Sequence, residues 1–266
     1  MDHILHEMKF ASIICSTGTR FRAKDAVAIK LWHQKGFVCI SAGYGKNANS
    51  HAGSLIALNR IWWHKKHISS FAYTTGRIQG RGLAVRLKRG QGDWMPVAAC
   101  AAPFQGQVAR VTADLFDWLT RLYLRCPARL LPILAGDLNS HVGMVYTQGR
   151  WQTPGSNSIG PCGAEKENAQ GKLLRNFCDK HGLAAINTGQ TSGSGKSYWN
   201  SNGRATSRPS YIVVPQSKKD QFTKCTVRKN LGYRVQCSES SLQIDHSPLQ
   251  AAPGLHQGGG FFGLEL

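Results

Sequence analysis

Acidic residues are scarce in this sequence. Asp and Glu number 14 among 266 residues, against 33 Lys and Arg, which gives a formal charge of +19 at pH 7. Two stretches, 26–92 and 180–219, contain no carboxylate, so neither can supply an acidic ligand to a metal ion. A positive field of this size favours a polyanion, and nucleic acid is the obvious one. Three alternatives stay open. The partner could be an acidic membrane surface or the chain could bind in a ribosome-like way, and a chain under no selection could simply have lost its acidic residues.

Other common signals are missing as well. The eight cysteines are scattered without a C-x-x-C pair, which argues against a zinc knuckle or a compact disulfide framework, so we expect mostly buried thiols. No apolar run is long enough to span a bilayer, and MDHILHEMKF carries acids and histidines where a signal peptide carries basic residues. We expect an intracellular protein with no membrane partner, and the nucleus is one compartment open to it.

What is present is an alternation of helical and strand patterns. We expect one domain over residues 1–251 and a flexible Gly-rich tail over 252–266. Apolar spacing and Gly or Pro stops predict helices over 26–36, 107–126 and 164–181. Short apolar runs predict strands over 37–43, 81–87, 95–102, 183–188, 198–203 and 211–215. This alternation is typical of an α/β fold.

The stretch LPILAGDLNSH reads as a hydrophobic strand that ends in two polar side chains. Asp137 and Asn139 are two residues apart, so in an extended strand they point to the same face and can converge on one site. The simpler alternative is a strand that ends in an Asx turn.

Six motifs carry a resemblance to a known superfamily. In chain order they are GDLN, ENAQGKLLRNFCDKHGL, AAINT, SYW, SRPSYIVV and IDHSPL. This order resembles that of the endonuclease/exonuclease/phosphatase superfamily, and within it the endonuclease domains of non-LTR retrotransposons. IQGRG at 78–82 and AACAAP at 98–103 add to the likeness, which covers about residues 10–250.

The resemblance implies a four-layer α/β sandwich, in which two packed mixed β-sheets are flanked by helices. It also implies Mg²⁺-dependent hydrolysis of DNA phosphodiester bonds, with an activated water attacking phosphorus. By match to the motifs, Asp137 would activate the water with Asn139 as its polar partner. Asp245 would lie near the metal, and His246 would contact the phosphate.

Four other positions depart from the family's pattern. They are Ser16 in place of an Asn in the first strand, Ala42 in place of the metal-binding Glu, Cys100 in place of a Tyr, and Ser210 in place of the Asp that orients the His. Mg²⁺ without a dedicated carboxylate should bind poorly, and a His without its orienting Asp loses control of tautomer and charge. We therefore predict a nuclease fold whose site is weak or inactive.

Two functions from different classes follow. One is a metal-dependent endonuclease of retroelement origin; the other, which the acid-free stretches favour, is a non-catalytic nucleic-acid-binding protein or a decaying retroelement fragment. A phosphatase of the same superfamily is a weaker third. We expect a monomer on duplex DNA, with phosphate contacts from Lys65, Lys66, Arg77 and Arg81. For the basic aromatic run 62–66, an edge strand with a solvated basic end is an equal alternative.

Overall fold

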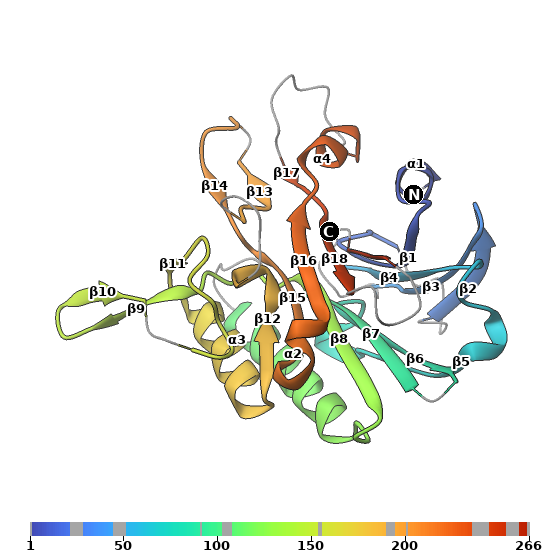
Figure 1. Ribbon diagram of the computed structural model, residues 1–266, viewed down its shortest axis with the longest axis horizontal. Helices are drawn as coiled ribbons and strands as arrows, with labels where there is room; N and C mark the ends of the chain where they lie inside the picture. The colour runs from blue at the N-terminus through green and yellow to red at the C-terminus, as the bar shows by residue number, and fades with distance from the viewer. Residues whose placement is uncertain are drawn as a thin grey trace.

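Two large β-sheets form the body of the computed structural model (Figure 1). The structure describes residues 2–21, 29–44, 52–90, 92–102, 108–153, 156–189, 195–200, 202–235, 245–253 and 261–264. The seven-stranded sheet has the order β16-β18-β19-β1-β4-β3-β2. Its strands are β1 (Ala11–Thr17), β2 (Ile29–Gln34), β3 (Phe37–Ala42), β4 (Ser54–Asn59), β16 (Phe222–Val227), β18 (Leu249–Pro253) and β19 (Phe261–Leu264).

The second large sheet has six strands in the order β12-β15-β8-β7-β6-β5. These are β5 (Ile68–Tyr73), β6 (Gly82–Arg89), β7 (Gly92–Cys100), β8 (Leu130–Asp137), β12 (Leu183–Ala185) and β15 (Ser210–Pro215). Two small sheets adjoin it. They contain β9 (Gly143–Thr147), β10 (Arg150–Gln152) and β11 (Glu165–Lys166), and β13 (Tyr198–Trp199), β14 (Thr206–Ser207) and β17 (Asp245–His246).

Helices cover the outer faces of both large sheets. On the six-stranded sheet, α2 (Val108–Leu124) and α3 (Ala169–Lys180) bury an apolar stripe in a cluster with β7, β8 and β15. On the seven-stranded sheet, α1 (Asp2–Glu7) buries Leu5 against β1, β3 and β4, and α4 (Lys229–Val235) contacts α1. The predicted four-layer α/β sandwich is confirmed. Among the described residues, no helix is long and apolar enough to cross a membrane.

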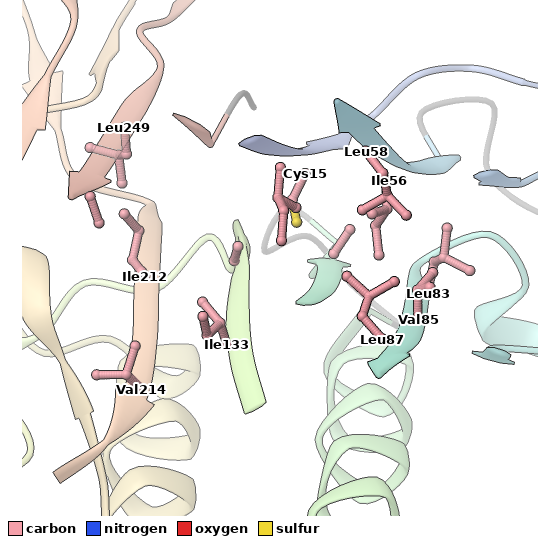
Figure 2. Packing of buried hydrophobic residues seen from close by; sticks show 14 of the residues in the cluster. Cys15, Ile56, Leu58, Leu83, Val85, Leu87, Ile133, Ile212, Val214 and Leu249 are labelled. Carbon is pink, nitrogen blue, oxygen red and sulfur yellow. The ribbon is translucent and has the colours of Figure 1, made fainter. Parts of the chain in front are cut away.

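The main core lies between the two sheets, where alternate residues of each strand point inward (Figure 2). Figure 2 shows Ile56 and Leu58 of β4 facing Leu83, Val85 and Leu87 of β6. Because side chains alternate along a strand, the residues that face this core also show which way the last residues of the same strand point. Those last residues lie at the end of the sandwich.

The helix predicted over 26–36 is wrong for its described part. Residues 29–34 form β2, paired with β3 along its whole length. Lys35 and Gly36 have φ of +47° and +83°, the left-handed pair that a two-residue β-hairpin turn requires. Pairing with a buried neighbour decided this segment, because an amphipathic pattern this short fits either state. Residues 26–28 lie outside the described part.

The other predicted helices and strands have counterparts, and three of them differ in their bounds. The strand predicted over 198–203 is reduced to Tyr198 and Trp199 in its described part. The helix predicted from 164 begins at Ala169, because the Asn168 side chain accepts the Gly171 N–H at 2.7 Å and caps the first turn. Glu165 and Lys166 form β11 instead, and after β12 the residues 186–188 form a 3₁₀ turn, η3 (Ile186–Thr188).

Residues 252–266 were expected to be a flexible tail, and their described residues are strand residues instead. Ala252 and Pro253 end β18, and β19 pairs with both β1 and β18. Strand β19 thereby satisfies the backbone groups along one edge of β1, which would otherwise remain unpaired.

Candidate active site at one end of the sandwich

Three candidate residues form a row across the six-stranded sheet. Asp137, at the end of β8, is paired with Cys100 of β7 and with Ser210 of β15. The residues two positions along each strand belong to the core between the sheets: Ala98, Ala135 and Ile212. Because side chains alternate along a strand, the row points to this inner face and forms the end of the core.

The opposite sheet contributes Thr17 and Ala42 to the same end. Ile13 and Cys15 of β1 face the inner core, so Thr17 does too, and its side chain lies close to the Cys100 thiol. Ser16 shares the outer face with Ile14, so the residue of the first strand that reaches the site is Thr17 rather than Ser16. Ala42 is buried on the inner face at the end of β3.

His246 lies between Ser210 and Asp137. Its Nε2 is 3.6 Å from Oδ2 of Asp137, and its Nδ1 is 3.5 Å from Oγ of Ser210. The imidazole is placed by β13, where Tyr198 pairs with His246 and the two ring centroids are 5.0 Å apart. Asp245 precedes it in β17, with its backbone paired to Trp199. Tyr198 is not among the residues predicted for the site, although its motif SYW is aromatic.

Asn139 reaches Asp137 through a turn. The strand ends at Asp137, and Asn139 has a φ of +47°, so alternation along an extended strand does not apply to this pair. The Asn139 N–H donates to Oδ1 of Asp137 at 3.0 Å, which is the Asx-turn contact. Its side-chain amide donates to the Ala101 carbonyl at 2.9 Å. Asn139 therefore fixes one carboxylate oxygen of Asp137 and ties the turn to the end of β7.

Arg81 is buried in the site and does not lie on the surface, where a phosphate contact was expected. Only 3% of it is exposed, and its guanidinium donates to the Cys100 carbonyl at 3.4 Å. Its positive charge and the negative charge of Asp137 both act on the Cys100 thiol. The site thus contains a fixed cation beside its carboxylate.

Cys100 is not suited to act as a nucleophile. Burial, together with the neighbouring charge of Asp137, raises the pKa of the Cys100 thiol to about 12. Only the thiolate is a strong nucleophile or metal ligand, so at neutral pH this side chain is a neutral, buried group. The seven described cysteines are all unpaired, and five are buried.

The donors described at this end do not form a cage for Mg²⁺. Across the described residues there is no group of three or more His, Cys, Asp or Glu side chains that could hold a metal ion. Asp137 and His246 are close, but the Ala42 side chain offers no donor atom. Because Mg²⁺ requires several oxygen ligands, these residues do not fit it, and metal binding through Asp245 stays a prediction.

The candidate phosphate contacts do not share one surface. Lys65 and Lys66, in η1 (Lys65–His67), are exposed, but they precede β5 at the end of the sheet opposite to Asp137, roughly 20 Å away along the strands. Trp63 beside them is buried in the core, so the run 62–66 is no continuous stacking surface. Arg77, in η2 (Gly76–Ile78), lies at the Asp137 end and pairs with Asp114 at 3.0 Å.

Solved structures share this fold over nearly the whole chain. A 3′-5′ exonuclease from Neisseria meningitidis has a TM-score of 0.61 at 14% identity, over 91% of this chain and 89% of that one. The chain has the fold of the endonuclease/exonuclease/phosphatase superfamily. The AP endonuclease LMAP from Leishmania major has a TM-score of 0.60 at 15% identity, over 94% and 83% of the two chains.

A retrotransposon protein has the same superfamily fold. The endonuclease domain of TRAS1, a telomere-specific non-LTR retrotransposon, has a TM-score of 0.56 at 13% identity, over 92% of this chain and 99% of that domain. No known family profile and no curated protein sequence matches the chain. The superfamily likeness is therefore one of fold, and the chemistry must be argued from the site's own residues.

Proposed function

We propose that this chain is a nucleic-acid-binding protein built on a nuclease fold of retroelement type, with little or no hydrolytic activity. The observation that carries the proposal is the contact of Ser210 Oγ with His246 Nδ1 at 3.5 Å. The resemblance puts an aspartate at this position. A neutral hydroxyl in its place neither stabilises a charged imidazolium nor fixes its tautomer as a carboxylate does.

The remaining groups support binding better than turnover. Hydrolysis of a phosphodiester needs positive charge where the transition state gains negative charge, and the superfamily's Mg²⁺ would supply it. The donor set described here does not fit that ion. Asp137 and His246 are left to orient a water or a phosphate, and Arg81 supplies a fixed charge. Losses of this kind lower the rate by orders of magnitude while phosphate attraction remains.

Duplex DNA is the partner that we propose, bound by a monomer. The net charge of +19 supplies the attraction. A related fold from Neisseria, a 3′ phosphatase, is described bound to a product DNA hairpin, which supports DNA as the class of ligand. Phosphate contacts of this sort give affinity without sequence preference.

A plasmid-nicking assay with Mg²⁺ and with Mn²⁺ tests the loss of activity, with Asp137→Ala as the control. We expect nicking at background for both proteins. Nicking well above background that disappears with Asp137→Ala would instead establish the second candidate, a working metal-dependent endonuclease, which the proximity of Asp137, Asn139 and His246 favours.

Fluorescence anisotropy with two unrelated duplexes of equal length tests the binding. We expect similar affinities that fall with salt, with a log-log slope of about −0.9 for each phosphate contact. Arg77→Ala, at the Asp137 end, should weaken binding more than Lys65→Ala with Lys66→Ala at the opposite end. No binding at low salt, or binding that salt does not weaken, would exclude this proposal.

A further inference from the structure

The hairpin of β9 and β10, which follows the GDLN turn of the candidate site in the chain, carries two exposed aromatic side chains. Strand β9 starts at Gly143, four residues after Asn139, and Figure 1 shows the hairpin projecting from the body of the molecule. Tyr146 is 60% exposed and Trp151 is 39% exposed. Large aromatic rings at a projecting tip are costly to leave in water, so a ligand that covers them gains free energy.

Both rings lie on one face of the hairpin, together with a lysine. Tyr146 and Trp151 are cross-strand partners whose ring centroids are 5.4 Å apart. Lys166 of β11 pairs with Met144, which is two residues from Tyr146 and therefore on the same face. The Lys166 ammonium lies 5.5 Å from the centre of the Trp151 ring. Tyr146, Trp151 and Lys166 are called the aromatic face below.

The aromatic face is turned away from the neighbouring small sheet. Glu165 precedes Lys166 in β11, so its side chain lies on the opposite face. There its carboxylate forms an ion pair with Lys196 and accepts the backbone N–H of Arg208. The first acid after the hairpin in sequence is thus engaged behind it, and residues 138–164 contain no Asp or Glu.

We propose that the aromatic face is a stacking platform for unpaired nucleotides. Bases of a single strand expose their flat faces, which stack on Trp and Tyr, while Lys166 beside the Trp151 ring faces their phosphates. The bases of a duplex are already stacked on one another, so a duplex offers this face only phosphates. The inference rests on the proposed function, and it adds the kind of nucleic acid that lies beside the site: a strand with unpaired bases.

A cross-strand aromatic pair also stabilises a hairpin that has little core of its own, so the test must separate stability from binding. Wild type, Trp151→Ala and Trp151→Phe are compared for binding to labelled oligo(dT) and to a duplex of the same length. Phe71→Ala is the matched control, because Phe71 is 42% exposed on β5, the edge strand away from β9. Thermal unfolding of each variant reports stability.

We expect Trp151→Ala to weaken oligo(dT) binding about tenfold while duplex binding changes by less than about twofold. Trp151→Phe should retain most of the affinity, since a ring remains, and Phe71→Ala should leave both affinities unchanged. If Trp151→Ala unfolds the protein, Tyr146→Ala decides the question, with an expected loss of severalfold on oligo(dT) alone.

Two negative outcomes point to different errors. Wild type that binds neither probe at low salt means that the proposed function is wrong. In the other outcome, wild type binds, and Trp151→Ala and Tyr146→Ala bind oligo(dT) with the same affinity as Phe71→Ala. Only the stacking platform is then wrong, and the aromatic pair serves the stability of the hairpin or another partner.

Discussion

Ser210 and His246 contact each other at the end of the sandwich, with the Ser210 hydroxyl 3.5 Å from Nδ1 of the imidazole. Ser210 is also the cross-strand partner of Asp137, whose carboxylate lies 3.6 Å from the other ring nitrogen. The imidazole is therefore flanked by a neutral group on one side and a carboxylate on the other. Changing the neutral group to a carboxylate is the most direct way to test what this site has lost.

Repair of the site should restore metal binding. Ala42→Glu with Ser210→Asp adds one carboxylate from each sheet at the end where Asp137 lies, because Ala42 and Ser210 both face the inner side. We expect Mn²⁺ binding by isothermal titration and metal-dependent nicking above the wild-type level.

The matched control for the repair is Ala42→Gln with Ser210→Asn, which has the same shape without the charge. It should bind no more Mn²⁺ than wild type. A folded repair variant that gains no binding over this control would show that the two positions do not face a common metal site.

Asp137→Asn should raise the affinity for DNA in buffer without metal. Its carboxylate repels incoming phosphates, and removing one charge a few ångströms from a phosphate is worth about 1 kcal/mol, roughly fivefold in Kd. Asp179→Asn removes the same charge at the far end of α3 and should change Kd by less than twofold. Weaker binding by Asp137→Asn would indicate that the carboxylate acts through a bound cation.

Gly136 in the GDLN motif is required by packing. A Cβ at Gly136 would lie 1.7 Å from the carbonyl oxygen of Ala99 on β7, and that backbone cannot move without breaking its pairing. Gly136→Ala should lower the free energy of unfolding by at least about 3 kcal/mol, measured by urea denaturation. At Gly92 no described heavy atom lies within 4 Å of the added Cβ, so Gly92→Ala should stay within about 0.5 kcal/mol of wild type. Similar losses at the two glycines would contradict the packing argument.

Buried thiols should make the fold sensitive to alkali. Burial raises the pKa of Cys15, Cys100 and Cys225 to about 12, well above the pKa of a thiol in an unfolded chain. The unfolded chain therefore loses these protons first, so this stability is complete below about pH 8.5 and declines between about pH 9 and 12. By pH 10, ionisation of each of these thiols in the unfolded chain lowers the free energy of unfolding by about 1–2 kcal/mol.

Urea denaturation under reducing conditions, at pH 7.5 and at pH 10, measures this loss. The free energy of unfolding of Cys15→Ala with Cys225→Ala should fall less between the two pH values than that of wild type. Cys162→Ala, at a half-buried position, serves as the control, and its free energy of unfolding should fall as much as that of wild type. Equal falls in all three proteins would show that the buried thiols do not cause the alkaline loss.

Local pattern was enough for much of the fold. The apolar spacing of 107–126 and of 164–181, with Pro127 and Gly182 as stops, led to α2 and α3, because these signals act within a few turns of helix. The order of GDLN, SYW and IDHSPL indicated the sandwich. The sequence alone also gives the net charge, the scarcity of acidic residues, and the motif residues Asp137, Asn139 and His246.

Contacts between distant segments decided the rest. Strand β2 exists because β3 pairs with it, and β19 because β1 and β18 leave a gap for it. A shift of one residue turns a side chain to the other face of a sheet, so only the register of β1 shows that Thr17, not Ser16, meets the Cys100 thiol. Arg81 looks like a surface cation in sequence, and its burial follows from the packing of two sheets around it, which no local pattern encodes.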